Sequence, residues 1–70
     1  MGQAQGIYLY QRALNKTRAN RSDWIVDMTT SSQCNYLPAH LYLIEFFCRQ
    51  NNPGKVEFHL NQVQKIENQR

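Results

Sequence analysis

Large apolar side chains are concentrated in one stretch, 36–49, which can be read with two different periods. With a helical period, one face holds Leu37, Leu41, Ile44 and Cys48, and polar residues gather on the opposite side. With a strand period, the stretch is an almost continuous apolar run that a turn at 53–54 would fold back into a second strand. We favour a helix over about 37–50, because the polar residues align and the length suits a helix.

Three further segments have the composition of β-strands. Residues 7–10 combine β-branched, aromatic and aliphatic side chains, and residues 24–28 would place every second side chain on one apolar face. Residues 56–61 alternate most clearly, with His59 on the polar side. Between the first two segments, residues 11–22 are polar and basic and suggest a mobile or partly helical connector.

These elements predict an α+β fold in a single small domain, residues 1–70. The strand segments would form a small antiparallel sheet (about 7–10, 24–28 and 56–61), and one main helix over about 37–50 would pack against it. The alternative is an all-β meander with a hairpin formed by residues 41–49 and 56–63.

The short length limits how stable the chain can be on its own. A chain of 70 residues buries only about 60% of the surface of its unfolded state, and small domains often depend on a partner subunit. We therefore expect a homo-oligomer or a complex. The polar ends, 1–6 and 65–70, are predicted to be loose. Residues 1–6 lack an apolar signal segment and no run is long enough to span a bilayer, which favours a cytoplasmic protein with no membrane partner.

Four potential metal ligands are Cys34, His40, Cys48 and His59. They show none of the close pairs that are typical of zinc sites, and on a helix His40 and Cys48 would stand roughly 12 Å apart. On the hairpin interpretation Cys48 opposes His59, but no orienting group, oxyanion motif or glycine-rich phosphate loop accompanies them. We expect no catalytic residues, no metal, no cofactor and no enzymatic activity.

A basic segment supplies the first functional candidate. The proposed nucleic-acid-binding residues are four cations and two preceding tyrosines: Arg12, Lys16, Arg18, Arg21, Tyr8 and Tyr10. Guanidinium groups match phosphate and tyrosine rings stack on bases, while the net charge of +3 permits an acidic partner. The sequence favours a non-catalytic, nucleic-acid-binding accessory or regulatory domain whose affinity falls with salt. The plainer interpretation is a solvated connector.

Aromatic and arginine residues supply the alternative, a protein–protein inhibitor or adaptor, for example a phage- or plasmid-type modulator. Trp24, Tyr42 and Arg49 are of the residue types enriched where protein interfaces gain most affinity. On the predicted helix, Tyr42 lies on the polar side beside Arg49. Binding to DNA or RNA should collapse when the four cations become glutamine, whereas docking on a protein should fail when Tyr42 or Trp24 is truncated.

Overall fold

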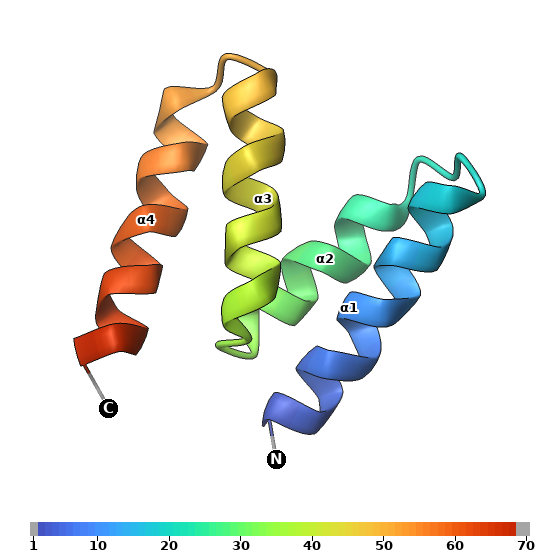
Figure 1. Cartoon of the computed structure of the whole chain (residues 1–70), viewed down its shortest axis with the longest axis horizontal. Coiled ribbons are helices and arrows are strands. Elements are labelled where there is room, and N and C mark those ends of the chain that lie inside the picture. Colours follow the sequence, from blue (N-terminus) through green and yellow to red (C-terminus); the bar gives the residue numbers. More distant parts are fainter. Residues whose placement is uncertain (1, 69–70) are drawn as a thin grey trace.

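The structure is all-helical, which overturns the predicted α+β fold with its small antiparallel sheet. The computed structural model describes the backbone of residues 2–68 and the side chains of residues 4–68, and this range contains no strand. The helices are α1 (Gly2–Arg18), α2 (Trp24–Gln33), α3 (Leu37–Arg49) and α4 (Pro53–Asn68) (Figure 1). The alternative all-β meander is wrong as well, because both segments of its predicted hairpin are helical.

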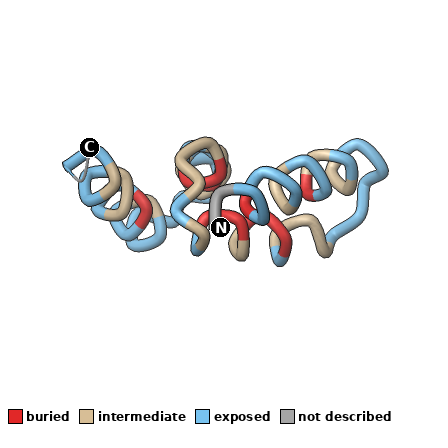
Figure 2. Tube along the Cα trace, turned by 90° about the horizontal axis from the view of Figure 1, so that it is seen from below, coloured by how far each residue is buried: buried red, intermediate tan, exposed pale blue. Residues whose placement is uncertain are grey.

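The helices form a thin slab. Its Cα atoms span 35 × 32 × 12 Å, which is too thin for two complete layers of helices whose axes lie about 8–10 Å apart. α1 packs against α2 and α3 packs against α4, and contacts of α3 with α2 and α1 join the two pairs. Within the described residues α4 contacts α3 alone, so α4 forms one edge of the slab (Figures 1 and 2).

The core contains few large side chains. Its fully buried apolar members are Ala13, Met28, Ala39 and Leu43, one or two from each of the first three helices. Figure 2 shows the buried positions along the lines where helices meet. Partly buried tyrosine, tryptophan and phenylalanine rings pack around this centre, so aromatic side chains supply much of the apolar contact.

The buried positions of α1 are occupied by small residues, so the helical period is hard to see and the large residues at 7–10 predict a strand instead. Gly6 and Ala13 are buried seven residues apart on one side of the helix. A Cβ atom at Gly6 would lie 2.9 Å from the Cβ atom of Tyr36. The Ser31 hydroxyl also donates a 2.6 Å hydrogen bond to the Gly6 carbonyl. α1 therefore approaches its neighbours too closely at this point for any side chain.

Residues 24–28 belong to α2, and their side chains do not alternate as a strand requires. Met28 is fully buried, whereas Val26, two residues earlier, is 62% exposed. The buried row of α2 is Asp27, Met28, Ser31 and Ser32, which repeats after one helical turn but is mostly polar. Both serines donate hydrogen bonds to backbone carbonyls, and these bonds allow their burial.

The alternation in residues 56–61 is also misleading. His59, expected on the outside, is 4% exposed, while Phe58 and Leu60, expected in the core, are 54% and 45% exposed. The inward row of α4 is Val56, His59, Val63 and Ile66, at spacings of three, four and three. A histidine in place of an aliphatic residue conceals the helical period.

The helix predicted for about 37–50 is present as α3, but it buries a different face. Ala39, His40 and Leu43 are the buried residues, whereas Leu41 and Cys48, assigned to the apolar face, are exposed. Because α3 has neighbours on two sides, α2 and α4, no single apolar stripe describes its burial.

All three turns between helices use an asparagine in the left-handed conformation. Asn20, Asn35 and Asn51 have φ angles of 58°, 61° and 58°. Asparagine adopts this region more readily than other residues that carry a Cβ atom. Asn52 and Pro53 then start α4, where the Asn52 side chain accepts a 3.3 Å hydrogen bond from the backbone N–H of Lys55.

Both ends of the described range are helical. Residues 2–6 and 65–68, predicted to be loose, belong to α1 and α4, and residues 1 and 69–70 lie outside the described range. None of the helices in residues 2–68 combines the length and the apolar character needed to cross a membrane.

Candidate functional site

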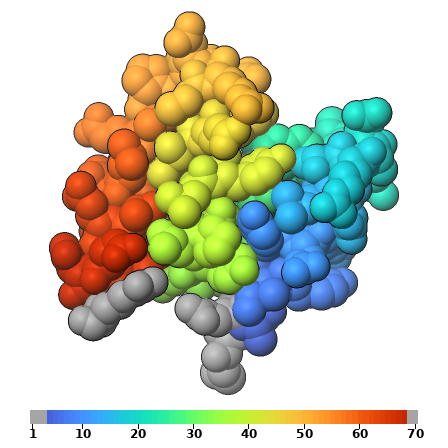
Figure 3. All heavy atoms as spheres, in the orientation of Figure 1, coloured from blue at the N-terminus to red at the C-terminus, as the bar shows by residue number. Residues whose placement is uncertain are grey.

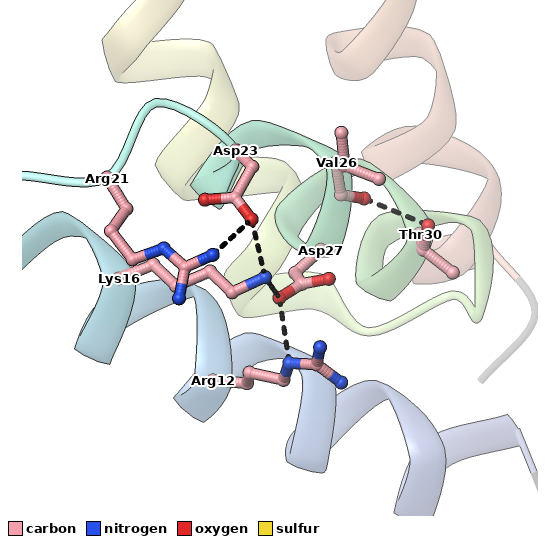
Figure 4. Close-up of polar contacts among 7 residues, drawn as sticks. All are labelled: Arg12, Lys16, Arg21, Asp23, Val26, Asp27 and Thr30. Atoms are coloured by element: carbon pink, nitrogen blue, oxygen red, sulfur yellow. Dashed lines mark hydrogen bonds and ion pairs between the residues drawn. The ribbon is translucent and has the colours of Figure 1, made fainter.

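The basic segment faces two aspartates around the start of α2 (Figure 4). Lys16 Nζ lies 2.9 Å from Asp27 Oδ2 and 3.1 Å from Asp23 Oδ2. Arg12 Nε is 3.3 Å from Asp27 Oδ2, and Arg21 Nη2 is 3.1 Å from Asp23 Oδ2. We call these five residues the ion-pair cluster. The two α1 cations are four residues apart, as are the two aspartates, so the pairs come into register across the helices.

Within the ion-pair cluster, the contacts of Lys16 and Asp23 favour the charged forms of these two residues. Hydrogen bonds to Asp27 and Asp23 hold the pKa of Lys16 above its ordinary value of 10.5, and the bond from Lys16 lowers the pKa of Asp23 below 3.8. The side chain of Lys16 is only 13% exposed, whereas those of Arg12 and Arg21 are 51% and 61% exposed. The ammonium group is therefore enclosed, while both arginines still face solvent.

The other predicted nucleic-acid-binding residues lie outside the ion-pair cluster. Arg18, at the end of α1, is exposed and donates a 3.4 Å hydrogen bond to the Asn15 side chain. Tyr8 is 61% exposed. Tyr10 packs edge-on against Tyr36 with 5.4 Å between ring centroids, so its ring serves contacts within the chain.

Of the predicted protein-interface residues, Trp24 packs against other rings of the chain, whereas Tyr42 and Arg49 reach a surface pocket. Trp24 contacts Phe46 and Tyr42 edge-on, with ring centroids 4.9 and 5.7 Å apart. Tyr42 and Phe46 also line a small pocket of about 90 Å³ with Glu45 and Arg49. Arg49 donates a 2.6 Å hydrogen bond to Glu45 at the surface. The structure thus brings Tyr42 and Arg49 to one pocket, whereas Trp24 packs behind them.

An exposed apolar face on α3 was missed by sequence reasoning, because these residues were assigned to the core. We call the row Leu37, Leu41, Ile44 and Cys48 the apolar stripe. Leu41 is 51% exposed, Cys48 is exposed, and the other two members are half-buried. On α4, Leu60 is 45% exposed. Figure 3 shows α3 and α4 side by side, with α3 between α4 and the α1–α2 pair.

A groove at the α3–α4 turn continues the apolar stripe. It encloses about 420 Å³, and its apolar lining is Phe47, Cys48, Pro53, Val56 and Leu60. The amides of Asn51 and Asn52 complete the lining, and Glu57 is its one charged residue. Because Cys48 belongs to both the stripe and the groove, the two form one continuous surface.

Two histidines are buried together between α3 and α4. His40 Nδ1 and His59 Nδ1 lie 2.8 Å apart, so one ring donates a hydrogen bond to the other, and Phe47 stacks on His59. Burial lowers the pKa of both imidazoles below the ordinary value of 6.5, and the nearby charges of His40 and Lys55 lower that of His59 further. The Ser32 backbone opposes the shift at His40.

The four potential metal ligands do not assemble. The structure brings His40 and His59 together without Cys34 or Cys48. Across the described residues, no group of three or more histidine, cysteine, aspartate or glutamate side chains is placed to hold a metal ion. The histidine pair is therefore best understood as a polar contact that joins α4 to α3.

The histidine pair predicts a stability that decreases in mild acid. Below pH 6.5 the unfolded chain binds protons that the folded histidines, with their lowered pKa, do not accept. The urea midpoint, followed by circular dichroism at 222 nm, should fall as the pH is lowered from 7.5 to 5. In His59→Gln, which cannot titrate but can still form a hydrogen bond, the slope should be shallower. An unchanged slope in that variant would contradict this assignment.

Three features thus stand out: the ion-pair cluster with Arg18 beside it, the apolar stripe with its groove, and the buried histidine pair. The first two reach the surface, and the third holds two helices together. Compared with protein-family models, with curated proteins and with solved structures, the chain matches none.

Proposed function

We propose that the chain is a non-catalytic protein-binding domain that docks through the apolar stripe of α3 and the adjoining groove. The observation that carries this proposal is the outward position of Leu41 and Cys48, with Leu60 beside the groove. Leaving apolar surface in water costs about 25 cal/mol per Å². A continuous apolar face with a polar rim is typical of protein interaction surfaces.

The shape of the surface supports a helical or extended protein segment as the ligand. The groove lies at the junction of two antiparallel helices, and such grooves bind amphipathic segments through a few apolar anchors. The His40–His59 pair lines neither of the two pockets described above, so its imidazoles do not face a ligand in either. This arrangement supports binding rather than catalysis.

Nucleic-acid binding is the second candidate. It is supported by exposed Arg12 and Arg18 in the second half of α1 and by exposed Arg21 in the turn that follows. However, Asp23 and Asp27 place two negative charges within 3.3 Å of three of the cations, and the best-enclosed cation is Lys16. The ion-pair cluster therefore offers phosphate a net charge of +1, from three cations and two aspartates. We rank this candidate second for that reason.

Photocrosslinking from the groove tests the proposed docking. A benzophenone side chain is placed at position 60 and, as a matched control, at position 61, which is exposed on the same helix but does not line the groove. In cells that produce the chain, irradiation is expected to give a discrete protein adduct from position 60 and little from position 61. Leu41→Glu should remove the adduct, because it places a charge in the apolar stripe.

Two results would count against the proposal. Either no adduct forms from position 60, or the adducts from positions 60 and 61 are the same. A fluorescence-anisotropy titration with random duplex and single-stranded DNA at two salt concentrations tests the second candidate. Binding that weakens steeply with salt and is lost in Arg18→Gln would make nucleic-acid binding the preferred function.

A further inference from the structure

We infer that the groove is occupied by a second copy of this chain, which binds head to tail through the opposite side of α4. This inference rests on the proposed function and names its partner. The observation behind it is a repeated pattern on α4, where the inward row that contains His59 separates two largely exposed flanks of opposite charge.

The two flanks have the same order of residue types. The acidic flank is Glu57, Leu60, Gln64 and Glu67. The basic flank is Lys55, Phe58, Gln62 and Lys65. Each follows spacings of three, four and three, and each reads charged, apolar, glutamine, charged. Because the flanks are offset by two residues, which is about 200° of helical rotation, they lie on opposite sides of α4.

The charges on the two flanks match in spacing as well as in sign. Lys55 and Lys65 are ten residues apart, as are Glu57 and Glu67, so each pair spans about 15 Å along the helix axis. If the α4 helices of two copies lie parallel, with the basic flank of one along the acidic flank of the other, both lysines meet glutamates. In this parallel orientation charge complementarity selects one register, whereas an antiparallel alignment that also paired the four charges would place Phe58 against Gln64.

The same register aligns the apolar residues. Phe58 of one copy then lies against Leu60 of the next, and Leu60 lines the groove of about 420 Å³. Phe58 is 54% exposed and Leu60 is 45% exposed, so both have apolar surface to bury in such a contact. An aromatic ring beside a groove of this size supplies the apolar anchor, and the charges set orientation and selectivity.

The charge pattern favours this head-to-tail contact over a two-fold dimer. A two-fold contact through the groove would bring Glu57 and Glu67 against the same acids of the other copy, and like charges repel. In the described part of the chain, the ion pairs engage none of the four charged residues of the flanks. Because the contact joins different surfaces, each bound copy keeps one flank open and the contact repeats along a chain of copies.

Charge reversal on each flank tests the inference. Purified wild-type chain should form species larger than a dimer that grow with concentration in sedimentation velocity at low salt. The variants Lys55→Glu/Lys65→Glu and Glu57→Lys/Glu67→Lys should each self-associate about tenfold more weakly or worse. An equimolar mixture of the two should regain assembly, because each restores the charge that the other lacks.

Controls separate a surface effect from misfolding. All four positions are exposed, and two of the changes, Lys55→Glu in the first turn and Glu67→Lys in the last, suit the helix dipole. Circular dichroism should show wild-type helix content in both variants. Asn61→Glu, which changes the charge outside both flanks, should leave assembly unchanged, and Phe58→Ala should weaken it.

Three outcomes would overturn the inference: wild-type chain that stays monomeric at every concentration, a closed dimer that both reversal variants still form, or a mixture that fails to regain assembly. Crosslinking from position 60 separates this failure from failure of the proposed function. An adduct with a different protein would show that the ligand of the groove is not a second copy, and the docking proposal would still hold. The absence of any adduct would remove both.

Discussion

Replacing Leu43 with alanine is expected to lower the free energy of unfolding by about 2–5 kcal/mol and to leave much of the chain unfolded. Leu43 is fully buried and is one of the two large side chains among the buried apolar residues. The loss combines the transfer free energy of the deleted atoms with the cost of the cavity. The total free energy of unfolding of a 70-residue domain is only about 4–10 kcal/mol, so a loss of this size is severe.

Leu41→Ala is the matched control, because it makes the same change two residues earlier in α3. Leu41 is 51% exposed, so its truncation should change the free energy of unfolding by no more than about 1 kcal/mol. Urea titrations followed by circular dichroism at 222 nm measure both variants. Equal losses from the two, or a larger loss from Leu41→Ala, would contradict the observed face of α3.

Replacing Gly6 with alanine is expected to destabilise the chain by about 1–3 kcal/mol, although alanine is the better helix former. The added Cβ atom would lie 2.9 Å from the Cβ atom of Tyr36 and 3.3 Å from that of Cys34. Neither atom is the end of a flexible side chain, so the backbone of α1 or of the α2–α3 turn has to move. The larger change Gly6→Val should cost more.

Gly54 supplies the comparison for Gly6. It lies in the first turn of α4, where an added Cβ atom would come no closer than 3.8 Å to the Asn52 side chain. Gly54→Ala should therefore be neutral or should stabilise the chain by up to about 1 kcal/mol through helix propensity. Thermal unfolding of both variants gives the comparison. A stabilising Gly6→Ala would contradict the close approach of α1 to Tyr36.

The central helix could be predicted because 37–49 contains many large apolar residues and ends at a strong stop, 51–54. The other helices could not, because their inward rows include small or polar residues. Ala13 in α1 is only a weak apolar signal in a hydrophobic pattern, and Gly6 in α1 and Ser31 in α2 give none. In α4 a buried histidine interrupts the row, and the remaining large residues happen to alternate.

The ion pairs between α1 and α2 could be predicted in part from the spacing of charged residues in the sequence. Arg12 and Lys16 are four residues apart, and so are Asp23 and Asp27. When both segments are helical, this equal spacing predicts ion pairs between the two cations and the two aspartates. The predicted strand over 24–28 concealed this relation. The exposed apolar face of α3 could not be predicted, because the direction in which a helix faces depends on where its neighbours pack.

The position of α4 at the edge of the slab has a consequence for motion. Because α4 packs on α3 alone among the helices of residues 2–68, it can detach and re-form without disturbing the contacts among the first three helices. Its amide protons then exchange with solvent through a local opening that costs less than global unfolding. The helix α4 would then behave as a separate cooperative unit, connected to α3 by the turn at Asn51 and by its inward row, which includes one of the two paired imidazole rings.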